Sequence, residues 1–219
     1  MQTERLGWKV KKKRILVIVS AVLAIVILAA VGFRIWLPYA DFGFSREISQ
    51  EEKNLRLQVV QTAQGWLGSE EGSDGHKEIL RIYNTHTPLA QGYAVQEDDS
   101  WCATFGSTVA IQCGLTEIIP TECSCERQIG LFRDMGDWEE KDDYVPLPGD
   151  YIFYTLKNPS MGDSTAWSDH VGIVVGTWNG FIKVIEGNNA NTVKYRILPV
   201  DDPRIRGFGL PDYQTETAS

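Results

Sequence analysis

The strongest pattern along the chain is an apolar run near its N-terminus. Residues 15–33 form 19 consecutive positions in which Ser20 is the only polar side chain. A helix of that length spans about 30 Å, the hydrocarbon thickness of a bilayer. Basic residues crowd the N-terminal side of the run, whereas only Arg34 follows closely on the other side. The positive-inside tendency therefore predicts a single-pass membrane helix, with residues 1–14 in the cytoplasm and all later residues outside the cell membrane.

Two alternative interpretations of this run are a cleaved signal peptide and a lipoprotein signal. A signal peptide has an apolar core of only about 7–15 residues and a small-x-small cleavage site, and no clear site of that kind follows the run. A lipoprotein needs a cysteine directly after the apolar segment, but the first cysteine is Cys102. The run is therefore interpreted as an anchor, with the signal peptide as the alternative.

Beyond the anchor, the spacing of apolar residues changes from helical to strand-like. Residues 34–49 show no sustained period and are interpreted as a stalk. Apolar positions at helical spacing predict helices over residues 51–67, 77–83 and 100–114. Short apolar segments between Gly, Asn and Pro predict strands over residues 150–156, 170–178, 181–186, 192–198 and 205–209. Helices followed by an antiparallel meander indicate an α+β domain over residues 50–213, with 214–219 as a tail.

Charge distinguishes the two sides of the anchor. The formal net charge of the chain is −8. The residues beyond 33 carry 15 basic and 28 acidic side chains, a balance of −13. Nucleic acid and anionic wall polymers repel a domain this acidic, so we expect no nucleic-acid partner. The membrane helix would instead hold the domain near its substrate.

The four cysteines stand at positions 102, 113, 123 and 125. A domain of this size can build a core without disulfides. If Cys102 and Cys113 share one helix, they lie about 16 Å apart along its axis, so Cys102 is predicted to be free. The Cys-x-Cys spacing is tighter than in the usual zinc motifs, and neither a metal nor another cofactor is expected. His76 and His86 lie in polar sequence and are predicted to be surface residues.

One cysteine and one histidine together suggest nucleophilic catalysis. Cys102 falls in the first turn of the helix predicted over 100–114, where unpaired N–H groups and the helix dipole favour a thiolate. The alternative is a small buried apolar residue among neighbouring aromatic side chains. A thiolate enzyme also needs an imidazole and a group that orients it. His170 begins one predicted strand, and Glu186 and Asn188 end the next.

The register of this hairpin decides whether such a triad can assemble. A two-residue turn after Trp178 would put His170 and Glu186 on opposite faces of the sheet. A three-residue loop, which pairs Thr177 with Phe181, would put both side chains on one face. We predict the three-residue loop because only that register brings the imidazole and the carboxylate together.

Four segments in order resemble the motifs of a known family: SWCATF at 100–105, PGDYIFY at 148–154, DHVGIV at 169–174 and VIEGN at 184–188. They resemble the CHAP family, the cysteine, histidine-dependent amidohydrolases and peptidases of bacteria and phages. That family belongs to the papain-like group, which includes the NlpC-type endopeptidases. The resemblance covers about residues 50–213. It implies a papain-like domain in which N-terminal helices pack on an antiparallel sheet.

The resemblance implies Cys102 as nucleophile, His170 as base, Glu186 as the group that orients the imidazole, and Asn188 as a further polar member of the site. It also implies that the substrate is peptidoglycan, cleaved by an N-acetylmuramoyl-L-alanine amidase or by an endopeptidase acting on stem peptides. Some members bind calcium through an Asp-x-Asp pattern just before the nucleophile. Residues 96–100 depart from that pattern, so no calcium site is implied.

Other interpretations remain open. Gln96 is either an oxyanion-hole donor or a solvated loop residue, and the backbone N–H of Cys102 is the alternative donor. The domain is alternatively a non-catalytic module that binds wall peptide or supports an envelope assembly, or an enzyme that acts on another peptide. Wall remodelling and local wall opening for conjugation or secretion are both compatible with the sequence.

Overall fold

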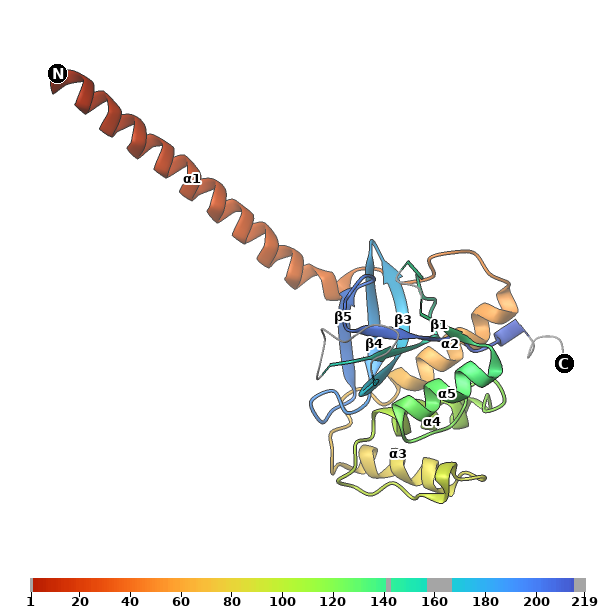
Figure 1. Ribbon diagram of the computed structural model, residues 1–219. Coiled ribbons are helices and arrows are strands. Elements are labelled where there is room, and N and C mark those ends of the chain that lie inside the picture. The colour runs from red at the N-terminus through yellow and green to blue at the C-terminus, as the bar shows by residue number, and fades with distance from the viewer. Residues whose placement is uncertain (1, 141–142, 157–166, 215–219) are drawn as a thin grey trace. The chain divides into compact units, whose positions relative to one another are not determined.

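The computed structural model describes residues 2–140, 143–156 and 167–214, with side chains of the first helix described from Ile18 onward. The chain divides into two compact units, Met1–Asp41 and Phe42–Ser219. The first unit contains α1 (Gln2–Trp36) and η1 (Leu37–Tyr39). The helices of the second unit (Figure 1) are α2 (Gln50–Gln64), α3 (Asp74–Thr85), η2 (Ala90–Gly92), α4 (Cys102–Cys113) and α5 (Cys125–Met135). Its strands are β1 (Trp138–Glu139), β2 (Tyr151–Tyr154), β3 (His170–Trp178), β4 (Phe181–Glu186), β5 (Lys194–Pro199) and β6 (Ile205–Gly209).

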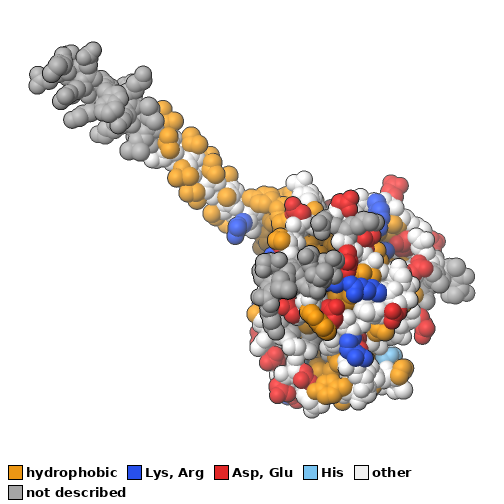
Figure 2. Space-filling view, in the orientation of Figure 1, with side chains coloured by type: hydrophobic (Ala, Val, Ile, Leu, Met, Phe, Trp, Pro, Cys, Tyr) orange, Lys and Arg blue, Asp and Glu red, His pale blue; other side chains and the backbone are white. Residues whose placement is uncertain are grey.

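The first unit contains a helix that is long and apolar enough to cross a membrane. The stretch Ile18–Tyr39 has a mean hydropathy of 2.6, and its side chains are not buried within the structure. Hydrophobic side chains cover the described part of α1 in Figure 2. Exposure of so much apolar surface to water is unfavourable, whereas a bilayer would cover it. The basic side chains predicted to mark the cytoplasmic side lie outside the part of α1 whose side chains are described.

The second unit is an α+β domain built on one antiparallel sheet, as the sequence predicts. Its six strands lie in the order β1-β6-β2-β3-β4-β5. Strands β2 to β5 form the expected meander, but β6 returns to the free edge of β2, and the two-residue β1 pairs with β6. Neither β1 nor α5 was predicted from the sequence. Of the tail expected at 214–219, only Gln214 is among the described residues, and its backbone N–H donates to the Asp212 carboxylate at 3.1 Å.

Short polar residues and glycines set the ends of the helices. Ser49 caps α2 by accepting a hydrogen bond from the Glu52 amide at 3.1 Å, and Ser73 caps α3 in the same way. Helices α4 and α5 end where Gly114 and Gly136 take left-handed backbone conformations, with φ of 71° and 83°. These local signals explain why the predicted helices differ from the observed ones by only a few residues.

Helix α4 is the central element of the second unit. Its residues 102–110 are buried, because the helix packs on strands β3 and β4 and also contacts α2, α3 and α5. Two glycines allow close approach between the helix and the sheet. A Cβ at Gly106 would lie 2.9 Å from the Tyr151 ring, and a Cβ at Gly187 would lie 2.4 Å from Phe105. The start of α4 therefore lies against the end of β4.

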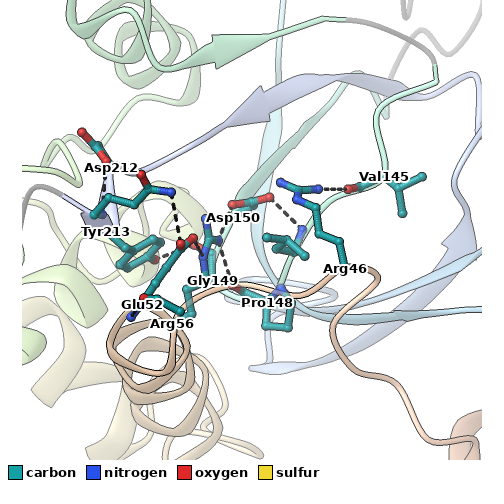
Figure 3. Close-up of polar contacts among 12 residues, drawn as sticks. Arg46, Glu52, Arg56, Val145, Pro148, Gly149, Asp150, Asp212 and Tyr213 are labelled. Atoms are coloured by element: carbon teal, nitrogen blue, oxygen red, sulfur yellow. Dashed lines mark hydrogen bonds and ion pairs between the residues drawn. The ribbon is translucent and has the colours of Figure 1, made fainter. Parts of the chain in front are cut away.

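A buried ion pair joins α2 to the start of β2 (Figure 3). The Arg56 guanidinium donates to Asp150 at 2.7 Å, to Glu52 at 2.7 Å and to the Pro148 carbonyl at 3.1 Å. Asp150 also accepts hydrogen bonds from the Tyr144 hydroxyl at 2.7 Å and from the Leu147 amide at 2.8 Å. The Pro-Gly-Asp segment therefore holds the helical layer on the sheet, which is a structural role.

The C-terminal end of the domain closes this network. The Arg56 guanidinium lies 4.5 Å from the centre of the Tyr213 ring, and the Tyr213 hydroxyl donates to the Gly149 carbonyl at 2.8 Å. A Cβ at Gly149 would come within 2.8 Å of that hydroxyl. Gly149 also has φ of 88°, a conformation that favours glycine. The turn before β2 thus requires a residue without a side chain.

Part of the segment interpreted as a stalk belongs to the second unit, which begins at Phe42. Gly43 forms an antiparallel bridge with Thr177, and its N–H donates to the Thr177 carbonyl at 3.1 Å. The Phe42 ring packs at 6.4 Å from that of Trp178. A Cβ at Gly176 would lie 2.7 Å from the Gly43 nitrogen, so Gly176 permits this contact.

Candidate active site

Cys102 is the first residue of α4 and is only 5% exposed. Trp101 precedes it and supplies no side-chain cap, so the N–H groups of the first turn have no capping side chain. These groups and the helix dipole favour negative charge at this position. The structure therefore places Cys102 where a thiolate is electrostatically favoured, at the interface between α4 and the sheet.

The turn between β3 and β4 has two residues, so the predicted three-residue loop is wrong. Asn179 and Gly180 take left-handed conformations with φ of 46° and 80°, as a tight hairpin turn requires. Trp178 consequently pairs directly with Phe181. In an uninterrupted ladder this register would separate the imidazole and the carboxylate onto opposite faces.

A β-bulge in β3 reverses that separation. The register shifts between Val174 and Gly176, so that Val174 pairs with Val184 and Ile173 with Ile185. Continuing this pairing sets Gly172 opposite Glu186. Because side chains two residues apart share a face, His170 and Glu186 then lie on the same side of the sheet. The triad geometry is therefore obtained by a bulge, and not by the loop that the sequence suggested.

His170 and Glu186 contact each other directly. The His170 Nε2 atom lies 2.9 Å from Glu186 Oε2, and both side chains are buried. A Cβ at Gly172 would lie 2.7 Å from the Glu186 Cγ, so the glycine lets this side chain cross β3. The Tyr154 ring stacks on the imidazole, with the two ring centres 6.0 Å apart. These contacts fix the orientation of the His170 ring.

Two further residues hold the carboxylate. Arg196, on β5, donates through Nε to Glu186 Oε1 at 2.6 Å, and the Asn189 amide donates to Oε2 at 2.8 Å. Neither residue was predicted from the sequence to belong to the site. Asn188 has a left-handed backbone with φ of 54°, and the amide that reaches Glu186 is that of Asn189. The sequence held only one signal for Arg196, its position in β5. That strand pairs with β4 and sets Arg196 opposite Val184, two residues from Glu186.

A second cysteine lies beside the first. Cys125 begins α5, and its sulfur is 3.6 Å from that of Cys102. Both residues are buried, and all four cysteines are free thiols. This contact was not predicted from the sequence, because α5 was not predicted. A usable signal was present, since Ser124 precedes Cys125, Ile129 and Phe132 form an apolar face, and a glycine ends the segment.

The electrostatics favour an ion pair between Cys102 and His170. The Cys125 hydrogen bond, the imidazole and the Val171 amide together lower the pKa of Cys102 well below its usual value, although burial opposes this. Burial also opposes the charge on His170, but hydrogen bonds and charge interactions with Cys102 and Glu186 raise its pKa to about 10. Because Nε2 faces Glu186, Nδ1 is the nitrogen left for the thiol. Both shifts favour the charged forms, a thiolate beside an imidazolium.

The groups that contact Cys102 and His170 have shifted pKa values of their own. Burial tends to raise the pKa of Glu186, but His170 and Arg196 outweigh it and lower that pKa. The pKa of Cys125 is raised well above its usual value, first by its hydrogen bond to Cys102 and then by burial. Cys125 therefore stays protonated and donates to the Cys102 thiolate.

His76 is not a surface residue, contrary to the prediction. It lies in α3 with an exposed fraction of 0%, and its ring packs 4.8 Å from that of Trp101. The Gly72 N–H donates to its Nδ1 at 3.1 Å. Burial lowers the pKa of His76, so the ring is neutral. The polar sequence around it concealed the burial because α3 turns this one polar residue toward the core.

The loop before Cys102 is organised by its own contacts. The Gln96 side chain is exposed and donates to the Ala94 carbonyl at 2.6 Å, as expected of a loop residue. Asp99 accepts hydrogen bonds from the Tyr93 hydroxyl and from the backbone N–H of Gln96, both at 2.8 Å. Within the described residues, no group of three or more His, Cys, Asp or Glu side chains could hold a metal ion.

Comparison with known proteins leaves the site to be interpreted on its geometry. No family model matches the chain, no curated protein matches it, and no solved structure resembles it significantly.

Proposed function

We propose that this protein is a membrane-anchored cysteine hydrolase of the CHAP type, which cleaves amide bonds in peptidoglycan. One observation carries the catalytic part of the proposal: Cys102 at a helix start interacts with His170, which Glu186 holds at 2.9 Å. This is the order of nucleophile, base and orienting group that acyl transfer through a thiol needs. The resemblance of four motifs to the CHAP family supports the papain-like fold and the wall substrate.

The residues divide the reaction into two steps. The Cys102 sulfur attacks the amide carbonyl, and the imidazolium of His170 gives its proton to the leaving amine as the thioester forms. Water then attacks the thioester, and the imidazole takes its proton as the sulfur leaves. Backbone N–H groups at the start of α4, including that of Cys102, are the proposed donors to the oxyanion. Glu186 keeps the imidazole oriented throughout, because Arg196 and Asn189 hold the carboxylate.

Product analysis tests the proposed activity. The full chain in detergent micelles is incubated with purified peptidoglycan, and the soluble products are identified by mass spectrometry. An amidase would release intact stem peptides from muramic acid, whereas an endopeptidase would create new termini within the peptides. We expect one of these two product sets, and none from the Cys102→Ala protein prepared in the same way. If the native chain releases neither set, the wall substrate is excluded, and a peptide-binding role becomes the alternative.

The proposed orientation places the second unit outside the cytoplasm. Its support is the cluster of basic residues before the apolar helix, with only Arg34 close behind it. The acidic balance of −13 beyond residue 33 favours a tether over electrostatic binding to anionic walls. Protease added to intact cells from which the wall has been removed is expected to degrade the second unit. A domain that resists until the membrane is broken would contradict this orientation.

A further inference from the structure

The two sulfurs at the candidate site are close enough to react with each other. Cys102 and Cys125 lie 23 residues apart in the sequence, yet their Sγ atoms are 3.6 Å apart. A disulfide bond is about 2.05 Å long, so each sulfur would move by only about 0.8 Å. The other two cysteines have different neighbours: Cys113 contacts the Thr62 hydroxyl and Cys123 the Gln91 amide.

We propose that Cys102 and Cys125 form an oxidative modification site that reacts with peroxides and closes to a reversible disulfide. The pairing itself follows from the geometry of the two thiols. Its consequence for activity rests on the proposed function, since the disulfide would consume the nucleophile of the hydrolase.

The two thiols are chemically unequal, which sets the order of the steps. Cys102 is held as a thiolate by His170 and by the hydrogen bond from Cys125, and the thiolate is the form that peroxide oxidises. Its sulfur attacks one oxygen of hydrogen peroxide, the O–O bond breaks, and hydroxide leaves. The sulfur has then lost two electrons and become a sulfenic acid, and the hydroxide takes up a proton to give water.

Cys125 completes the reaction as the resolving thiol. Once Cys102 is a sulfenic acid, Cys125 no longer donates to a thiolate, and that hydrogen bond and the thiolate charge no longer raise the pKa of Cys125. The Cys125 sulfur then attacks the Cys102 sulfur, the S–S bond forms, and the S–O bond breaks. The departing hydroxide takes the Cys125 proton as water. In total, two thiols and one peroxide give one disulfide and two waters, and an added dithiol restores both thiols by exchange.

The disulfide would also protect the site. Without a resolving thiol, a sulfenic acid is oxidised further to sulfinic acid, which a dithiol does not reduce. Cys102 is 5% exposed and His170 is 7% exposed, and hydrogen peroxide is small enough to react with a sulfur of such limited exposure. A buried partner at 3.6 Å acts faster than a second peroxide molecule because the two sulfurs are already adjacent.

The experiment uses the full chain in detergent with Cys113→Ala and Cys123→Ala, which leaves only the proposed pair. After hydrogen peroxide treatment, remaining thiols are blocked and the protein is cut after glutamate. Glu117 and Glu122 separate the two cysteines, so the disulfide would join peptide 98–117 to peptide 123–126. We expect this linked species, two hydrogen masses lighter than the sum of the free peptides, and its loss on treatment with dithiothreitol.

The matched control carries Cys125→Ala in the same background, with Cys125→Ser as a second variant if the first does not fold. Peroxide should then convert Cys102 to sulfinic acid, and dithiothreitol should not recover it. If no linked peptide forms while Cys102 oxidises equally in both proteins, the proposal is overturned. The thiol readout needs no substrate, so a linked peptide in a protein that never cleaves peptidoglycan would refute the proposed function and leave the modification site standing.

Discussion

Replacing Cys102 with alanine is expected to reduce peptidoglycan hydrolysis by roughly a thousandfold or more, the usual cost of losing a covalent nucleophile. Cys102→Ser should be similarly inactive, because an alcohol is not ionised by a neighbouring imidazolium as a thiol is. The Cys113→Ala protein is the matched control: this cysteine ends the same helix, and its thiol donates to the Thr62 hydroxyl. It should retain most of the activity.

The same variants have a readout that does not depend on the substrate. Because the pKa of Cys102 is lowered and that of His170 is raised to about 10, we expect the ion pair to persist through neutral pH. Iodoacetamide should therefore alkylate Cys102 at a rate that changes little around pH 7. Cys113, whose pKa is raised by burial, should react faster as the pH increases. Equal loss of hydrolysis in the Cys102 and Cys113 variants would remove the assignment of the nucleophile.

The second large effect is expected on stability. Asp150→Asn should lower the free energy of unfolding by about 3 kcal/mol, because the buried Arg56 guanidinium loses one of its two carboxylate partners and keeps only Glu52. The Tyr144 hydroxyl and the Leu147 amide also lose a charged acceptor. Arg56→Met should have a comparable effect, since it leaves the buried carboxylates of Glu52 and Asp150 without their cation. Denaturation of the full chain in detergent by urea would measure both changes.

An exposed ion pair provides the control for this prediction. Arg81 and Glu78 lie 2.6 Å apart on α3, but their side chains are 61% and 42% exposed. Arg81→Met should therefore leave the unfolding transition almost unchanged. The Asp150→Asn and Arg56→Met double variant should lose less stability than the sum of the single variants, because both remove the same contact. Additive losses would show that the two side chains do not act as one unit.

Local signals in the sequence predicted most of the helices and strands of this protein, although not α5 or β1. The apolar run predicted the long N-terminal helix, a serine marks the start of α2, and a glycine marks the end of α4. The limits of β3 and β4 were predicted correctly because glycine and asparagine mark the turn between them. Such signals act over one or two turns of helix or one hairpin, so they are legible without knowledge of the fold.

Only the tertiary structure decided how the candidate site is assembled. The first five residues of β3 are buried on both faces, so apolar alternation could not reveal its phase or its bulge. The roles of Arg196, Asn189 and Cys125 depend on contacts across β5, a loop and α5, which no local pattern encodes. The burial of His76 likewise depends on a contact between distant segments, the packing of its ring against Trp101. The position of Cys102 at a helix start follows from the sequence. The groups that contact its sulfur, Cys125 and His170, are brought there by packing between elements distant in the chain.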